Sequence, residues 1–408
     1  MGRSQITCRR DASSRLKIIV LGYVVRGPIG GMAWHHLQYV LGLKSLGHDV
    51  LFLEDSGDYP SCYNPSTHEV GTNPDYGLRF AERAFARLDL TACWAYHDAH
   101  LQRWHGPAME RIANFCDEAD VLLNVSGVNP LHGALQEIPI RVLIDTDPVF
   151  TQVRHLLDRD AHERAAQHNV FFSFGELIEL GESMVPDDGF HWQATRQPVV
   201  LDAWPVDDGP LAGPFTTVMQ WDSYPATEFD GRRFGMKSES FHFVSDLPAR
   251  VAVPLEIALG GRSAPRCELE RGGWRLVDPL AVTRDPWTYQ KYLRNSRGEF
   301  SVAKHGYVAG RSGWFSERSA CYLASGRPAV VQDTGFSRHL PCGEGLWAFT
   351  DAETAIESLN QVNVDYRSQC RVARDMATQY FDSAKVLASL LERATPVAEY
   401  SSPERLAK

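Results

Sequence analysis

The hydrophobic positions near the start of the chain change their period from one segment to the next. Residues 16–21, LKIIVL, are almost all apolar, which is typical of a strand buried on both faces of a parallel sheet. In residues 32–46, leucine and valine recur three and four positions apart, which predicts a helix with one buried stripe. Residues 50–53, VLFL, predict a second buried strand. Strand, helix and strand in this order form one unit of an α/β fold.

The same succession of elements continues along the chain and restarts near its middle. A proline-punctuated stretch, 198–214, predicts a linker, and a new series of elements begins with a strand at 215–219. Apolar runs predict further strands at 121–124, 141–144, 169–174, 250–257, 300–303 and 328–332. Helices are expected at 316–325, 351–360 and 366–391.

This pattern predicts two α/β halves of similar size. We expect a flexible tail at 1–14, an N-terminal domain at 15–202, a linker at 203–214 and a C-terminal domain at 215–385. The end of the last helix and a tail occupy 386–408.

Composition restricts the class of protein further. The 408 residues include 41 Lys and Arg against 51 Asp and Glu, a formal charge of −10, which argues against a broad basic face for nucleic acid. No apolar run approaches the ~18 residues of a membrane span, and the N-terminal residues lack the apolar region of a secretory signal. The eight cysteines are scattered, so reduced thiols are expected. We predict a cytoplasmic monomer or homodimer.

The loop between the first strand and the first helix is a candidate anion site. Gly30 and Gly31 permit backbone amides to approach an anion, and the helix that follows adds its N-terminal partial charge. The spacing is not that of the G-x-G-x-x-G dinucleotide fingerprint. His35 and His36, in the first turn of this helix, are candidates for a catalytic base or for holding a sugar hydroxyl.

The segment 310–335 carries a second and denser set of anion-binding groups. A glycine- and serine-rich loop opens a helix, and the strand that follows ends at the edge where open α/β sheets bind ligands. The candidate residues are Arg311, Ser316, Glu317, Arg318, Ser319, Asp333, Thr334 and Gly335.

Within this segment, residues 322–331, YLASGRPAVV, resemble the nucleotide-sugar-dependent glycosyltransferases of the GT-B fold. The glycine loop at 30–31 and the run 47–50, GHDV, are similar to the opening of the same family. The resemblance implies two Rossmann-like domains facing a central cleft. It also implies hexosyl transfer from a nucleoside-diphosphate sugar, a co-substrate, to a small-molecule acceptor, without a metal or other cofactor.

The resemblance also suggests roles for particular residues. Similar enzymes use a basic residue near Lys237 to neutralise the leaving diphosphate, with Arg233 as the second candidate here. The acidic residue of many retaining members falls on Cys321, and Glu317 is the nearest carboxylate. Inversion and retention therefore both stay open.

Further candidates follow the strands of the N-terminal half. Asp145 and Asp147 form a D-x-D motif, which suits either a divalent metal or, in a two-domain cleft, an acceptor contact at Asp145 and a base at Asp147. His132 and Arg196 are candidates for the acceptor side. The alternatives to a transferase of small molecules are a UDP-sugar 2-epimerase-like enzyme, a DNA-modifying glycosyltransferase and a non-catalytic sugar-nucleotide-binding protein.

Overall fold

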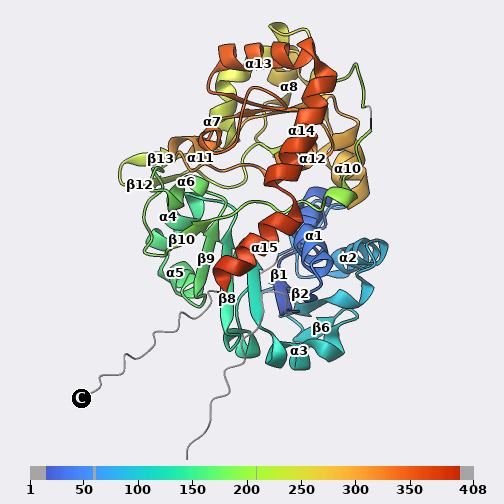
Figure 1. Ribbon diagram of the computed structural model, residues 1–408, viewed down its shortest axis with the longest axis vertical. Coiled ribbons are helices and arrows are strands. Elements are labelled where there is room, and N and C mark those ends of the chain that lie inside the picture. Colours follow the sequence, from blue (N-terminus) through green and yellow to red (C-terminus); the bar gives the residue numbers. More distant parts are fainter. Residues whose placement is uncertain (1–14, 58–60, 208, 396–408) are drawn as a thin grey trace, which may run out of the picture.

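Two parallel sheets, one in each half of the chain, form the framework of the protein (Figure 1). The computed structural model describes residues 15–57, 61–207 and 209–395. The predicted tail at 1–14 and residues 396–408 of the predicted C-terminal tail lie outside the described residues. In the described part of the chain, none of the helices combines the length and the apolar character that crossing a membrane requires.

The N-terminal sheet has eight strands in the order β10-β9-β8-β7-β1-β2-β5-β6, and all neighbouring pairs are parallel except β5 and β6. Its central strands are buried along almost their whole length, because helices cover both faces. The strands are β1 (Lys17–Leu21), β2 (Asp49–Asp55), β5 (Trp94–Asp98), β6 (Arg103–His105), β7 (Val121–Val125), β8 (Ile140–Asp145), β9 (Val170–Ser173) and β10 (Trp192–Ala194).

The C-terminal sheet has six parallel strands in the order β15-β14-β11-β16-β17-β18. These are β11 (Phe215–Gln220), β14 (Leu255–Gly260), β15 (Arg275–Val277), β16 (Gly298–Ser301), β17 (Ala329–Gln332) and β18 (Leu346–Phe349). The strand predicted at 250–257 begins later, at Leu255, since Pro254 immediately precedes it. The prediction of two α/β domains with Rossmann-like sheets is confirmed.

Fifteen α-helices, seven short 3₁₀ helices and two short hairpins complete the regular structure of the described chain. The hairpins are β3 (Cys62–Asn64) with β4 (Glu69–Gly71) and β12 (Thr227–Phe229) with β13 (Arg232–Phe234). The helices are α1 (Gly30–Ser45), α2 (Asp75–Arg87), α3 (Ile112–Glu118), α4 (Phe150–Leu157), α5 (Arg159–Ala165), α6 (Glu176–Glu179), α7 (Lys237–Phe241), α8 (Arg266–Arg271), α9 (Pro279–Thr283), α10 (Pro286–Arg294), α11 (His305–Ala309), α12 (Glu317–Ala324), α13 (Ala352–Val364), α14 (Tyr366–Tyr380) and α15 (Ser383–Ala394).

The C-terminal helices connect the two domains. The helix expected over 366–391 is interrupted after Tyr380, where the Asp382 side chain caps a new helix by accepting from the amide of Ala384. As a result α14 packs on α12 of its own domain, whereas α15 crosses to the N-terminal domain and packs on α1 (Figure 1). At this contact a Cβ on Gly42 would lie 2.6 Å from Leu387 Cδ1, so the glycine permits the close approach.

A second contact between the domains lies at the N-terminus of α1. A Cβ on Gly30 would lie 2.3 Å from the carbonyl oxygen of Asp285, and one on Gly31 would lie 3.1 Å from the Tyr289 ring. The Trp34 indole donates to the Pro286 carbonyl at 2.8 Å. The adjacent glycines therefore let α1 pack against α10, and this packing accounts for both of them without an anion.

Candidate functional site

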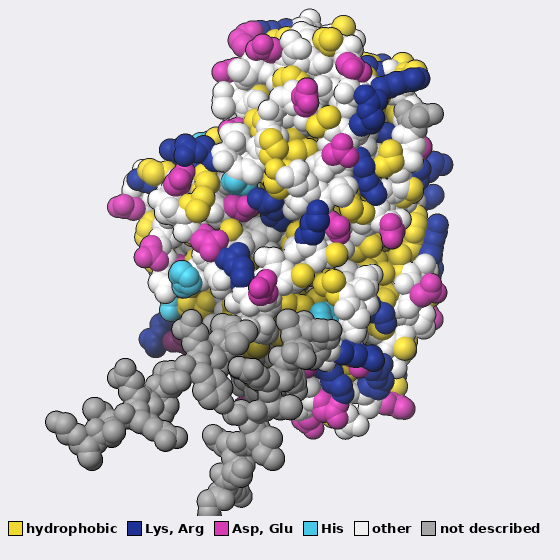
Figure 2. Space-filling view, in the orientation of Figure 1, with side chains coloured by type: hydrophobic (Ala, Val, Ile, Leu, Met, Phe, Trp, Pro, Cys, Tyr) yellow, Lys and Arg dark blue, Asp and Glu magenta, His cyan; other side chains and the backbone are white. Residues whose placement is uncertain are grey.

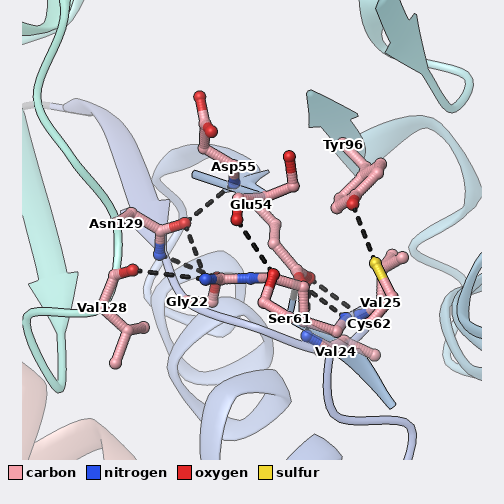
Figure 3. A network of polar contacts seen from close by, with 12 residues as sticks. Gly22, Val24, Val25, Glu54, Asp55, Ser61, Cys62, Tyr96, Val128 and Asn129 are labelled. Atoms are coloured by element: carbon pink, nitrogen blue, oxygen red, sulfur yellow. Dashed lines mark hydrogen bonds and ion pairs between the residues drawn. The ribbon is translucent and has the colours of Figure 1, made fainter. Parts of the chain in front are cut away.

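The loop that follows β1 is fixed by a buried polar network (Figure 3). The Glu54 carboxylate, at the end of β2, accepts from the amides of Val24, Val25 and Arg26 at 2.6, 2.8 and 2.7 Å. The Arg26 guanidinium donates to the same carboxylate at 3.2 Å. Both side chains are buried, so the loop is held by charge-assisted bonds that water does not reach.

Asn129 ties the loops after β1, β2 and β7 together (Figure 3). Its carbonyl accepts from the Asp55 amide at 2.8 Å and from Arg26 at 3.2 Å, and its amide donates to Gly22 at 2.8 Å. These loops form a rigid rim at the carboxyl edge of the N-terminal sheet, which is the edge where α/β folds bind ligands.

The cationic side chain of the C-terminal domain that is best placed to bind an anion is Lys237, at the start of α7. Burial, followed by the positive charge of Arg318, lowers the pKa of Lys237 to about 7. The charges of Glu317 and Lys304 also act on this pKa. The Met236 carbonyl accepts from the amide of His305 at 3.2 Å, so Lys237 lies beside the segment that contains Lys304. Among residues 15–57, 61–207 and 209–395, Lys237 has no hydrogen-bond or ion-pair partner.

The beginning of α12 lies beside this lysine. The Ser316 hydroxyl caps the helix by accepting from the amide of Arg318 at 3.2 Å, and Glu317 occupies the first turn. A small cavity of about 10 Å³ lies between this helix start and the carboxyl ends of β16 and β17. Its lining includes Ser301, Ala303, Trp314, Ser316, Ser319 and Gln332.

Arg318, a predicted donor-binding cation, is engaged inside its own domain. Its guanidinium donates to Glu299 at 2.7 Å, to the Ser301 hydroxyl at 2.7 Å and to the Val218 carbonyl at 3.0 Å. The arginine therefore joins α12 to β11 and β16, and it also lines the cavity. Arg311, in contrast, is exposed and adopts a left-handed backbone conformation with φ of 42°.

The predicted residues after β17 build a turn. Asp333 accepts from the amide of Gly335 at 2.8 Å, and the Thr334 hydroxyl donates to the Trp314 carbonyl at 2.5 Å. A Cβ on Gly335 would lie 2.6 Å from Leu177 of α6, so this turn packs against the N-terminal domain. Thr334 thus bonds to a residue that lines the cavity, Trp314. The Asp333 carboxylate accepts hydrogen bonds from its own turn and from Ser337.

The two carboxylates of the D-x-D motif have different surroundings. Asp145 is buried and accepts from Thr151, Gln152, Ser173 and the amide of Asp147, at 2.6 to 3.0 Å, and burial raises its pKa. It anchors the start of α4 and is not free for an acceptor. No group of three or more His, Cys, Asp and Glu side chains is arranged to hold a metal ion anywhere in the described residues.

Asp147 instead contacts three side chains of the C-terminal domain, Tyr224, Lys304 and Tyr307. We call these four residues the Lys304 cluster. The Lys304 ammonium lies 2.8 Å from Asp147 Oδ1, and the hydroxyls of Tyr224 and Tyr307 donate to the same carboxylate. Since Asp147 follows β8 and Lys304 follows β16, this cluster lies where the carboxyl edges of the two sheets meet.

Comparison with known proteins is informative for the fold. No protein-family model and no curated protein sequence matches the chain. Among solved structures, an α-glucosyltransferase in complex with UDP and a 13-mer DNA matches with a TM-score of 0.56 and 11% identity, over 94% of this chain and 100% of that one. HepE of Anabaena, in complex with UDP and glucose, matches with a TM-score of 0.53 and 10% identity, over 94% and 100%. The chain has the GT-B fold.

The two histidines of α1 are both buried but have different surroundings. His35 contacts Gln197 through Nδ1 at 2.6 Å and Ser126 through Nε2 at 3.4 Å, and burial lowers its pKa. His36 is fully buried against Gly22 and Tyr23, and burial also lowers its pKa. The structure therefore does not bring His36 to a surface where a substrate hydroxyl could meet it.

His132 and Arg196, the other predicted acceptor-side residues of the N-terminal domain, have different surroundings. His132 is 62% exposed and lies 3.4 Å from Asp55, which also binds His97 at 2.8 Å. Arg196 forms a two-pronged ion pair with Glu176 at 2.6 and 2.7 Å. His132 is open to a ligand, whereas Arg196 is occupied.

Three residues of the site were missed in the sequence: Tyr224, Lys304 and Tyr307. Lys304 comes directly after the predicted strand at 300–303, so its place at a strand end was a usable signal. Neither tyrosine belongs to a motif, and their contacts with Asp147 span 77 and 160 positions of the sequence.

Proposed function

We propose that this protein is a glycosyltransferase that moves a sugar from a nucleoside-diphosphate sugar to an acceptor. The observation that carries the proposal is Lys237, a cation without a partner among the described residues, beside the start of α12 at the carboxyl edge of the C-terminal sheet. Both of the solved structures compared above contain UDP, which supports UDP as the first nucleotide to test.

The chemistry follows from the charge that develops during transfer. As the glycosidic bond to the diphosphate breaks, negative charge grows on the leaving oxygens, and positioned cations and amides stabilise it. Lys237 and the first amides of α12 supply such groups, with Arg311 and the cap residue Ser316 at the same loop. Arg318 acts indirectly by holding α12 against β16.

The acceptor side offers two candidates for proton transfer. The Asp147 carboxylate lies between the two sheets, and His132 is exposed at the rim of the N-terminal sheet. Inversion requires a base near the acceptor hydroxyl, and Asp147 is the better placed of the two. Cys321, where many retaining relatives carry a carboxylate, is buried and accepts from Gln38 at 3.7 Å, so it does not supply that group.

We infer that the acceptor is a small molecule. The α-glucosyltransferase in the comparison was solved with DNA, so DNA is the second acceptor class to test. The formal charge of −10 opposes DNA binding. On the face of the molecule seen in Figure 2, acidic and basic side chains are interspersed.

The direct test is titration calorimetry with UDP, TDP and GDP, followed by product mass spectrometry with the matching sugar donors. We expect one nucleotide to bind and Lys237→Met to weaken its binding by about tenfold to a hundredfold, the range for loss of a charged hydrogen bond. Arg232→Met, which removes an exposed cation of the β13 hairpin, is the matched control and should leave the affinity unchanged.

Each other outcome identifies an alternative. Binding without hydrolysis or transfer across acceptors, DNA included, would favour a non-catalytic sugar-nucleotide-binding protein. Conversion of a UDP-sugar to its 2-epimer without an acceptor would favour an epimerase. Failure of all three nucleotides to bind would reject the proposed function.

A further inference from the structure

We propose that Lys304 is a second cation for the donor diphosphate and that Asp147 forms an ion pair with it while no donor is bound. When the diphosphate binds, it replaces Asp147 as the anion that pairs with the Lys304 ammonium. The exchange breaks an ion pair between the two domains and leaves the Asp147 carboxylate without its cation. This inference rests on the proposed function, because it concerns the same donor.

The first support is the convergence of three C-terminal groups on one N-terminal carboxylate. The Lys304 ammonium lies 2.8 Å from Asp147 and 2.7 Å from the Tyr224 hydroxyl, and both phenols donate to Asp147. The separation in sequence between Lys304 and Asp147 is 157 positions, so the pair exists because the domains meet. A pair of this kind reports directly on whether the cleft is closed.

The second support is access. The Lys304 side chain is 13% exposed and that of Asp147 is 25% exposed, so an anion can approach without unfolding the site. The Arg318–Glu299 pair nearby is 8% and 0% exposed and has no such access. Of these two ion pairs beside β16, only the Lys304–Asp147 pair can exchange its anion.

The third support is the set of rings that surround the ammonium. Its Nζ lies 4.4 Å from the ring centre of Tyr224, 5.0 Å from that of Phe150 and 5.2 Å from that of Tyr307. Aromatic faces attract a cation without neutralising it. The rings therefore keep Lys304 in position when Asp147 gives way to another anion.

The fourth support is the distribution of neighbouring cations. The amide of His305, next to Lys304, donates to the carbonyl of Met236, next to Lys237, at 3.2 Å. Lys304 also comes directly after Ala303, which lines the cavity at the start of α12. A diphosphate carries more than one negative charge, so it is matched better by Lys237 and Lys304 together than by either alone. The like charges of the two lysines also favour an anion between them.

The test is a double-mutant cycle on UDP binding, measured by calorimetry with the whole chain. Asp147→Asn should raise the affinity about twofold to fivefold, the value of a partly exposed ion pair, because UDP no longer competes with Asp147 for Lys304. Lys304→Met should lower it about tenfold. In the double variant the gain from Asp147→Asn should vanish, because the ammonium is absent.

Glu182→Gln is the matched control. It removes another ion pair between the domains, the one with Arg338 at 2.9 Å, and should leave UDP affinity unchanged. If Asp147→Asn does not yield folded protein, as judged by its melting transition, Asp147→Ser takes its place.

Two results would overturn the inference while the proposed function stands. In the first, the wild type binds UDP but neither Asp147 variant binds it more tightly. In the second, replacing Asp147 still raises the UDP affinity when Lys304 has also been replaced. A wild type that binds UDP, TDP and GDP equally poorly would instead reject the proposed function.

Discussion

The ion pairs Arg318–Glu299 and Lys304–Asp147 both lie beside β16, but they differ in what they join. Arg318 and Glu299 belong to one domain, lie 2.7 Å apart and are almost completely buried. Lys304 and Asp147 belong to different domains, lie 2.8 Å apart and are partly exposed. The comparison teaches that similar charges at similar distances take different roles: the enclosed pair holds elements together, and the accessible pair can release its cation to a ligand.

The largest expected effect concerns the enclosed pair. Glu299→Gln leaves the Arg318 guanidinium buried without its carboxylate, so we expect a loss of about 3–5 kcal/mol in the free energy of unfolding. Urea denaturation measures this, with Glu228→Gln at the exposed β12 strand as the control. A loss below about 1 kcal/mol, the range of surface pairs, would remove the distinction between the two pairs.

A second prediction separates packing between the domains from charge between them. Gly30→Ala places a methyl group against the carbonyl of Asp285, so α1 and α10 must move apart, at a cost of about 1–3 kcal/mol in stability. The control is Gly71→Ala, because a Cβ on Gly71 meets no atom within 4 Å. Gly47 is not used, because its φ of 89° would strain an alanine. An unchanged melting temperature for Gly30→Ala would show that this contact does not hold the domains together.

A third prediction uses pH to sharpen the assignment of the cations. Lys237 carries its charge below a pKa of about 7 and loses it above, and a diphosphate binds the charged form. Affinity for UDP should therefore fall as pH rises from 7 to 8.5, by about tenfold. The charge of the UDP diphosphate is nearly constant there, because the last ionisation of the diphosphate lies near pH 6. The measurement is calorimetry across this range.

Lys237→Arg provides the control for the pH series. Arginine stays charged throughout, so its UDP affinity should be nearly flat between pH 7 and 8.5. An equally steep fall in this variant would mean that a group other than Lys237 titrates.

The smallest effect is expected at the exposed pair between Arg338 and Glu182. Arg338→Gln should change the free energy of unfolding by less than about 0.5 kcal/mol, because solvent screens the pair. Thermal denaturation at low and high salt is sufficient to check this. A loss as large as that of Glu299→Gln would show that exposure does not distinguish the pairs.

The fold was predictable from the sequence because its central strands are buried on both faces. The runs at 16–21 and 50–53 became β1 and β2, since continuous apolar stretches suit a parallel sheet. The boundary of β14 and the break between α14 and α15 were missed. Pro254 and the Asp382 cap decide these positions locally, against the longer pattern.

The site was predictable only in part, because a sequence shows where charges fall and not what neutralises them. Asp145 and Asp147 were both selected because they follow a predicted strand. Thr151, Gln152 and Ser173 donate to the Asp145 carboxylate, however, so only Asp147 is available in the cleft. Arg318 was predicted as a free cation, and Glu299, on the neighbouring strand, binds it. Lys304 and its two tyrosines meet Asp147 through the packing of two domains, which no local pattern records.

The most direct test of the account is calorimetric titration of UDP into the wild type and into Lys237→Met, with Arg232→Met beside them. The account predicts a measurable affinity for the wild type and the Arg232 variant, and an affinity about tenfold to a hundredfold weaker for the Lys237 variant. Equal UDP affinity in all three proteins would contradict the assignment of the diphosphate to Lys237 and the start of α12.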